Sequence, residues 1–229
     1  MRLMIFTLTV ALGCAPLFGK DDKSSTDARL DDAATLFSDI MGSPDKSIPQ
    51  DLLNKAQCMV LVPGLKKGAF VVGGKFGRGY AVCRRQGGEG WGPPAAIRIE
   101  GGSFGLQIGF SSSDVILLVM NESGMKKLNQ SKFTIGAEAT AAAGPVGRDA
   151  TAQTDAMMHA EILSWSRSRG VFAGVSLDGA TLRNDLDENK VMYGQRWTSS
   201  EILFSGAKPP AGGDKLISIL NKYSPRKTS

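Results

Sequence analysis

Residue types that could do acid–base chemistry gather in one short stretch of this sequence. His159 is the only histidine of the chain, and together with Asp155 and a serine it could form a catalytic triad. No nucleophile elbow accompanies it, and the neighbouring residues Met157, Met158 and Ile162 indicate that His159 is packed against apolar side chains. A secreted enzyme with a site around His159 is therefore kept only as an alternative hypothesis.

The same stretch also holds oxygen and nitrogen ligands that could bind a metal ion. His159 and Glu161 fit one face of a strand, but the spacing of the four candidates matches no established metal site. We expect a hydrogen-bonded polar cluster here, and neither a metal nor another cofactor. The four candidates are Asp149, Asp155, His159 and Glu161.

Two of the three cysteines, Cys58 and Cys83, are spaced so that they could form a disulfide in an oxidising compartment. For a loop of this size, the chain-entropy model gives a stabilisation of roughly 3 kcal/mol. The sequence is equally compatible with two buried free thiols, so both alternatives stay open.

Basic residues form a third candidate site. We expect Lys66 and Lys67 in a turn between strands at 58–62 and 69–73, with Arg78 and the other arginines on the following strand. If these strands are antiparallel neighbours, the basic side chains converge into one patch; the alternative is a solvated face that keeps the protein soluble. The candidate lipid-binding residues are Lys66, Lys67, Lys75, Arg78, Arg84 and Arg85.

The net charge of +5 also suits an anionic surface. The sequence has no helix-turn-helix, zinc-finger or RNA-binding signature, so we expect no nucleic-acid partner.

The composition predicts a β-rich single domain that would position these residues. With 28 glycines and only 7% aromatic residues, the chain favours short strands with tight turns. The pattern Gly-Gly-x-Phe-Gly occurs at 73–77 and again at 101–105, and such glycines allow bends and bulges in a twisted sheet. Neither copy continues with Gly-Lys-Ser/Thr, so a nucleotide-binding loop is not predicted.

The stretch 101–120 predicts a hairpin at the centre of the sheet. Phe104, Leu106, Ile108 and Phe110 alternate onto one face, residues 111–114 form the turn, and the uninterrupted apolar run 115–120 reads as a strand buried on both faces.

Other patterns supply the remaining elements. Helical spacing appears at 26–41, 47–55, 121–130, 197–204 and 214–223, and the first of these helices has an acidic polar face. Further strands are expected at 95–100, 133–143, 161–166 and 171–177. The predicted fold class is α+β, with a strongly curled antiparallel β-sheet or barrel-like core flanked by short N- and C-terminal helices.

The N-terminus predicts export. Residues 1–19 contain one positive charge, an apolar run at 3–15 and then small residues, which is typical of a signal peptide. Cys14 lies in a sequence that imitates a lipobox, so lipidation at Cys14 and ordinary cleavage after Gly19 are both retained. We expect a periplasmic protein or a membrane-anchored lipoprotein, with a flexible segment at 20–25 and a single domain at 26–229.

Five blocks of the sequence resemble the SYLF family, also called the Ysc84 family. They are VPGLKKGAF (62–70), GGKFGRG (73–79), GGSFGLQ (101–107), GPVGR (144–148) and SRSRGVFAGV (166–175), and the match runs from about Ser47 to Gly194. The resemblance implies a lipid-binding module: eukaryotic members bind phosphoinositides and some bind actin, while bacterial members are exported.

The leading hypothesis is thus a non-enzymatic exported module that binds anionic phospholipid membranes through basic loops. Actin binding is not expected of an exported protein. A structural cell-envelope protein is the other alternative to the enzyme hypothesis, although the short glycine-broken strands and lysine-rich C-terminus disfavour an outer-membrane barrel.

Overall fold

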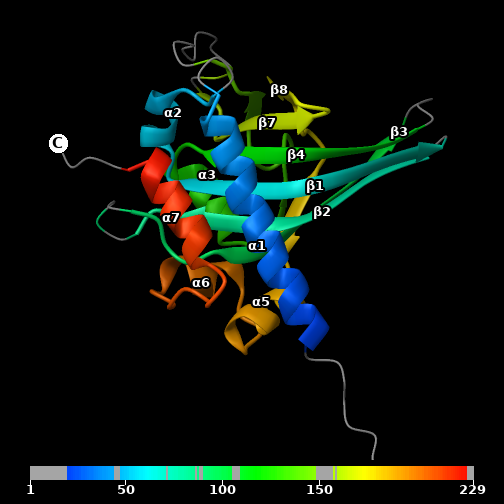
Figure 1. Cartoon of the computed structure of the whole chain (residues 1–229). Coiled ribbons are helices and arrows are strands. Elements are labelled where there is room, and N and C mark those ends of the chain that lie inside the picture. Colours follow the sequence, from blue (N-terminus) through cyan, green and yellow to red (C-terminus); the bar gives the residue numbers. More distant parts are fainter. Residues whose placement is uncertain are drawn as a thin grey trace, which may run out of the picture.

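The computed structural model describes residues 20–43, 47–70, 72–85, 87, 90–104, 109–147, 157 and 159–225. The predicted signal peptide at 1–19, including Cys14, lies outside the described residues. Within the described part, strands and helices together form one α+β structure with a strongly curled sheet, as the sequence predicted (Figure 1).

Nine strands of the described chain form one sheet, in the order β5-β9-β3-β2-β1-β4-β7-β6, with β8 paired to β7. All pairs are antiparallel except β6 with β7, which is parallel and departs from the predicted all-antiparallel sheet. The strands are β1 (Cys58–Phe70), β2 (Val72–Cys83), β3 (Ala95–Phe104), β4 (Gly109–Val119), β5 (Lys132–Thr134), β6 (Ala141–Ala143), β7 (Ile162–Ser168), β8 (Val171–Gly174) and β9 (Thr181–Asn184).

The predicted central hairpin at 101–120 is wrong, because β3 and β4 are not neighbours. Strands β2 and β1 lie between them, and β4 pairs with β1 instead. The apolar run at 115–119 pairs with the equally apolar run at 58–62, so that both strands are buried on both faces at the centre of the sheet. Residues 111–114, predicted as a turn, belong to strand β4.

Strand β1 is longer than predicted, because it does not end at Pro63 and Gly64. The pairing register shifts between Leu61 and Lys66, which marks a bulge, and the strand then continues to Phe70. Gly64 adopts a φ of 65°, and its N–H donates to the Asp114 carboxylate at 3.0 Å. The backbone of Lys66 and Lys67 is therefore extended strand and not turn.

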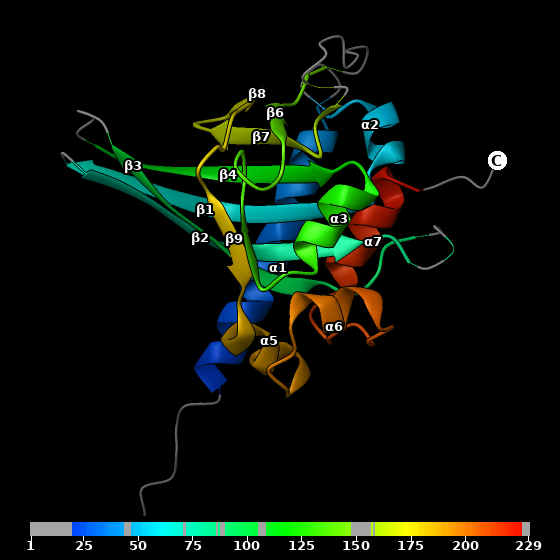
Figure 2. The same cartoon turned by 180° about the vertical axis from the view of Figure 1, so that it is seen from behind.

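Helices cover both faces of the sheet. The helices are α1 (Lys20–Met41), α2 (Gln50–Lys55), α3 (Glu122–Leu128), α5 (Leu186–Tyr193), α6 (Ser199–Phe204) and α7 (Asp214–Tyr223). Helices α1, α2 and α7 pack on one face through Phe37, Leu53 and Leu216, and buried residues of α3 and α6 pack on the other. Figure 2, from behind, shows α3 and α6 on the side opposite α1.

Most predicted helices are present, with shifted ends. Helix α7 has the predicted bounds, and α3 is capped by Asn121, whose side chain accepts from the Gly124 N–H at 2.9 Å. Helix α1 begins at Lys20, so the segment predicted as flexible, 20–25, forms its first turns. The predicted strand at 133–143 is wrong: Gly136, with a φ of 83°, turns the chain between β5 and β6.

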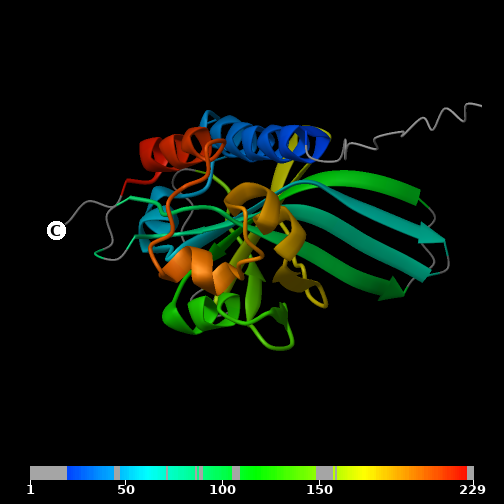
Figure 3. The ribbon, with the colours of Figure 1, turned by 90° about the horizontal axis from the view of Figure 1, so that it is seen from below.

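The outer ends of the four long strands project beyond the helices as an arm. We use this name for residues 66–70 of β1, 72–76 of β2, 101–104 of β3 and 109–112 of β4. Figures 1 and 3 both show these strand ends extending past α1 on the side away from α7. The register places them at a common level, since Phe70 pairs with Val72 and Val72 pairs with Phe104.

Candidate functional site

Two lysines of the predicted basic patch lie directly opposite each other on the arm. Lys67 of β1 pairs with Lys75 of β2, and Lys75 pairs in turn with Gly101 of β3. Directly opposite residues of an antiparallel pair project from the same face of the sheet. The lysine pair, as we call Lys67 and Lys75, therefore places two cations side by side.

The surroundings of Lys75 depress its pKa. Partial burial is the larger cause and the positive charge of Lys67 the next, while the carboxylate of Asp178 opposes both. The Lys75 ammonium donates a hydrogen bond to the Asp178 carbonyl at 3.4 Å. Its stem lies over Gly101, where an added Cβ would come within 3.2 Å of Lys75 carbon atoms.

Lys66 projects from the reverse face of the arm, because successive strand residues alternate. It pairs with Phe76 on one side and with Ser112 on the other. Phe110 lies on the same face, over Gly68, where an added Cβ would approach its ring to 2.9 Å. Phe76 is 46% exposed and Phe110 94% exposed. We call Lys66, Phe76 and Phe110 the aromatic face.

Arg78 lies inward of the arm and is engaged by acidic groups. Its Nε is 3.1 Å from Asp185 and its Nη1 is 3.5 Å from Glu188. Glu188 also pairs with Arg29 of α1 and accepts a hydrogen bond from the buried Tyr80 hydroxyl at 3.1 Å. Burial first, and the Glu188 charge second, raise the pKa of Tyr80. This network ties α1 and α5 to β2.

Arg84 is buried at the opposite end of β2. Its guanidinium donates to the carbonyls of Ser224 at 2.6 Å and Leu53 at 3.1 Å, and its Cζ lies 4.1 Å from the Trp91 ring centroid. Arg85 is exposed, and its Nε donates to the Trp91 carbonyl at 3.0 Å. Nine strand positions separate Arg84 from Lys75, which corresponds to roughly 30 Å.

The structure thus divides the predicted basic patch. Lys66, Lys67 and Lys75 come together on the arm, although on its two faces, while the three arginines do not join them. The sequence grouping was misleading because β1 and β2 are much longer than predicted, so residues close in sequence lie at opposite ends of one strand pair.

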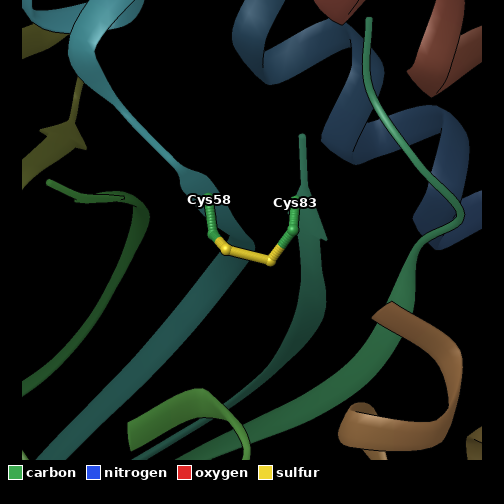
Figure 4. The surroundings of a disulfide bond; sticks show 2 residues. All are labelled: Cys58 and Cys83. Atoms are coloured by element: carbon green, nitrogen blue, oxygen red, sulfur yellow. A yellow bond between two sulfur atoms is a disulfide. The ribbon is translucent and has the colours of Figure 1, made fainter. Parts of the chain in front are cut away.

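A disulfide joins Cys58 and Cys83 at the end of the β1–β2 pair away from the arm (Figure 4). The two residues are directly opposite in register, with Cα atoms 4.0 Å apart, and both are buried. Of the two alternatives that the sequence left open, the structure contains the disulfide. Since Arg84 follows Cys83, the disulfide and the buried guanidinium strengthen the same end of the sheet.

The structure describes two of the four residues of the predicted polar cluster, His159 and Glu161. His159 is exposed, so the prediction that it is packed is wrong. Glu161 accepts hydrogen bonds from Ser123 and from the Thr140 N–H, which outweigh the effect of burial and lower its pKa. Asp149 and Asp155 lie outside the described residues. Among the residues that the structure does describe, no three potential ligands are placed to hold a metal ion.

A cavity of about 520 Å³ lies between α1 and the bulge of β1. Its walls include Arg29, Asp114 and Arg167, and the Arg167 guanidinium is 2.8 Å from Asp114 and 3.0 Å from Asp39. Because Arg167 pairs with Asp114 and Asp39, and Arg29 pairs with Glu188, the cavity does not present one dominant sign to a ligand. We therefore consider the arm the better candidate.

Sequence reasoning missed the aromatic face. The sequence pattern placed Phe110 with Phe104, Leu106 and Ile108 on one apolar strand face. The structure exposes Phe110, and the side chains of the other three lie outside the described residues. The serines at 111–113 and the paired glycines Gly68 and Gly74 were the available signal, because they leave little apolar material to cover a phenylalanine there.

No helix in the described part of the chain is long and apolar enough to cross a membrane. The arm is the surface that projects furthest from the helices in Figure 1.

Comparison with known proteins identifies relatives of the chain. Residues 100–223 match the family model Ysc84, described as Las17-binding protein actin regulator. LAS seventeen-binding protein 3 of Saccharomyces cerevisiae is 31% identical over 179 residues, which cover 77% of this chain and 39% of the yeast protein. SH3 domain-containing YSC84-like protein 1 is 32% identical in Homo sapiens, over 79% of this chain and 53% of the human protein, and 33% identical in Xenopus laevis.

The chain therefore spans between two fifths and about half of the length of these relatives. The names of these relatives describe binding proteins and an actin regulator, and none of them describes an enzyme. The family match covers more than half of the chain, and the relatives extend it to more than three quarters. The chain belongs to the Ysc84 family.

Proposed function

We propose that this protein is a non-enzymatic module that binds anionic phospholipid membranes through the lysines of its arm. The observation that carries the proposal is the direct opposition of Lys67 and Lys75 on β1 and β2. Like charges placed directly opposite in a sheet destabilise it, by up to about 1 kcal/mol. A phosphate group between the two ammonium groups turns this repulsion into attraction.

The arm supplies enough charge for reversible binding. Each lysine brought close to an anionic membrane contributes about 1 kcal/mol. Lys66, Lys67 and Lys75 together contribute roughly 3 kcal/mol, which corresponds to about a hundredfold in affinity. Lys66 is exposed, and the other two are partly exposed, so all three reach a flat surface without rearrangement of the fold.

The position of the arm favours a surface over a small soluble ligand. The lysines are spread over both faces of a projecting sheet and do not line the cavity beside α1. When the end of the arm approaches a flat anionic surface, the lysines on both faces of the arm come close to that surface. The acidic side chains of α1, such as Asp27 and Asp31, lie on the helix and not on the arm. They therefore add no negative charge to the part of the protein that would contact the membrane.

We also propose that the protein is exported. The apolar run at 3–15 supports this, and the Cys58–Cys83 disulfide is of the kind that persists in oxidising compartments. The relatives' names refer to Las17 and to actin regulation, which are properties of those proteins. An exported chain meets neither cytosolic actin nor phosphoinositides, so anionic phospholipid of the cell envelope is the proposed partner.

Vesicle co-sedimentation of charge-reversal variants tests the proposal. A variant with Lys66, Lys67 and Lys75 changed to glutamate should lose at least about tenfold in affinity for phosphatidylglycerol vesicles. The matched control changes Lys126, Lys132 and Lys208 to glutamate; these are exposed lysines outside the arm, so the net charge changes by the same amount.

The comparison between the two variants shows whether vesicle binding depends on the arm lysines or only on the net charge. Binding that falls equally in both would show that only the overall charge matters and would reject the arm as the site. Circular dichroism and thermal unfolding of each variant confirm that the fold is retained.

A further inference from the structure

The aromatic face of the arm adds a second chemistry to the lysine pair. Phe110 is 94% exposed and Phe76 46% exposed, and both project from the same face around Lys66. Single exposed apolar residues are ordinary, but two phenylalanines gathered on one projecting face indicate a surface that contacts something apolar.

We propose that the aromatic face enters the interfacial layer of the bilayer, with Phe110 as the anchor that reaches the acyl chains. This inference rests on the proposed lipid-binding function and extends it. Electrostatic attraction by the lysines then brings the arm to the membrane, and burial of Phe110 holds it there.

The register sets the depth at which each side chain would lie. The β1–β2 pair ends at Phe70 and Val72, and Phe110 lies at the level of Gly68, two positions inward. At about 3.3 Å per residue, Phe110 is roughly 7 Å from this end and the lysine pair roughly 10 Å from it. Interfacial elements bury their apolar faces by about 5–10 Å.

These depths match the layers of a bilayer. When the end of the arm enters to the depth of Phe110, Lys67 and Lys75 lie at the level of the phosphates. Lys66, slightly further from the end than Lys67, can extend its ammonium to the same level while its methylene stem lies along apolar material. Phe110 lies nearer the end of the arm than the lysine pair and so enters the bilayer more deeply, whereas Phe76, which pairs with Lys66, lies one position further from the end than the lysine pair and stays at the level of the headgroups.

The glycines of the arm leave room for this contact. Gly68 pairs with Phe110 on one side and with Gly74 on the other, and neither glycine has a side chain that could cover the Phe110 ring. A second copy of the chain is a less suitable occupant, because packing two aromatic faces together by a two-fold axis brings Lys66 of each copy into the same apolar contact.

Tryptophan fluorescence tests the insertion. Phe110→Trp places a reporter on the arm. Gln130→Trp places a matched reporter at an exposed position two residues after α3, a helix that lies away from the arm (Figures 1 and 3). The full chain is titrated with phosphatidylglycerol vesicles, with and without brominated acyl chains, and the signal of the unsubstituted protein is subtracted.

We expect the tryptophan at position 110 to shift to shorter wavelength on binding and to be quenched by brominated lipid, while the one at position 130 changes in neither respect. Phe110→Ser, at a site too exposed to affect folding, should weaken binding by roughly fivefold to tenfold. It should also remove the part of the binding that survives high salt.

Three results would overturn the inference, and they differ from one another. Vesicle binding without shift or quenching at position 110 leaves the lipid-binding function standing and rejects insertion. No vesicle binding by the unsubstituted protein rejects both. A shift at position 110 without lipid, together with a dimer in sedimentation velocity that Phe110→Ser dissociates, assigns the face to a second copy of the chain.

Discussion

Lys67 and Lys75 face each other across the β1–β2 pair, although no acidic side chain of the paired strands lies beside them in register. The backbone register holds these two cations together, and the Asp178 carboxylate near Lys75 offsets part of their repulsion. Such an arrangement reduces the stability of the free protein and favours an anionic partner.

Lys67→Thr should therefore act in opposite directions on stability and on binding. Removing one charge of the lysine pair should raise the free energy of unfolding by about 0.5–1 kcal/mol and weaken binding to anionic vesicles by about fivefold. Urea denaturation and co-sedimentation measure the two effects. Lys66→Thr is the control, because it introduces the same β-branched residue in the neighbouring strand position without removing a charge from the pair; equal stabilisation by both variants would refute the repulsion.

Arg84→Gln should lower the stability of the protein and leave its binding to vesicles unchanged. The Arg84 guanidinium satisfies the carbonyls of Leu53 and Ser224 in the interior, so its loss should reduce the free energy of unfolding by about 2–4 kcal/mol. Vesicle binding per folded molecule should not change. A clear loss of vesicle binding by the folded variant would show that Arg84 is part of the lipid-binding site after all.

Replacing both Cys58 and Cys83 by alanine should destabilise the protein by about 3 kcal/mol, because the disulfide closes a loop with a sequence separation of 25. Equilibrium unfolding of the double variant against the oxidised protein measures this difference. Since the disulfide lies at the end of the sheet away from the arm, binding to vesicles should be retained below the unfolding transition. An unchanged midpoint would show that the disulfide does not support the fold.

Alkaline pH should weaken binding through Lys75. Its pKa is lowered from the ordinary 10.5, by partial burial first and by Lys67 second, so Lys75 loses its charge at a lower pH than an unperturbed lysine. In this window the unfolded chain holds more protons than the folded one, so stability rises as the pH rises through the folded pKa. Binding to phosphatidylglycerol should fall over the same window.

Lys75→Arg separates this effect from a general loss of positive charge, since arginine stays protonated throughout. The substitution should preserve binding at the alkaline end of the titration, whereas Lys66→Arg should not. Identical profiles for the two variants would contradict the assignment to Lys75.

Mass spectrometry of the protein purified from its native cells tests export. The mature chain should begin either at a lipidated Cys14 or just after Gly19. A mature chain that retains Met1 would contradict both forms of the proposal.

Local patterns in the sequence predicted much of the fold. Helices α7 and α3 depend on residues within one or two turns, such as the Asn121 cap of α3, so both helices could be predicted from the sequence. Strands β7 and β8 were also predicted, and in the structure they pair across a tight turn in which Arg169 and Gly170 have positive φ values.

Strand pairing between distant segments was not predictable in the same way. The apolar run at 115–119 was assigned to β3, its neighbour in sequence, but β1 offers an equally apolar partner and pairs with it. Strand β9 was missed because four residues such as Thr181–Asn184 acquire their structure only from pairing with β3 and β5. The arrangement of the basic residues could not be predicted for the same reason, since it depends on where β1 and β2 end.

The most direct test of the central claim is the affinity of the unsubstituted protein for vesicles in which neutral phosphatidylcholine is progressively replaced by phosphatidylglycerol, measured at low and at high salt. Binding through the arm lysines predicts that affinity rises steeply with the anionic fraction and falls as salt is raised above about 0.15 M, where charges are screened beyond about 8 Å. Equal affinity for neutral and anionic vesicles, or binding that salt does not weaken at all, would contradict it.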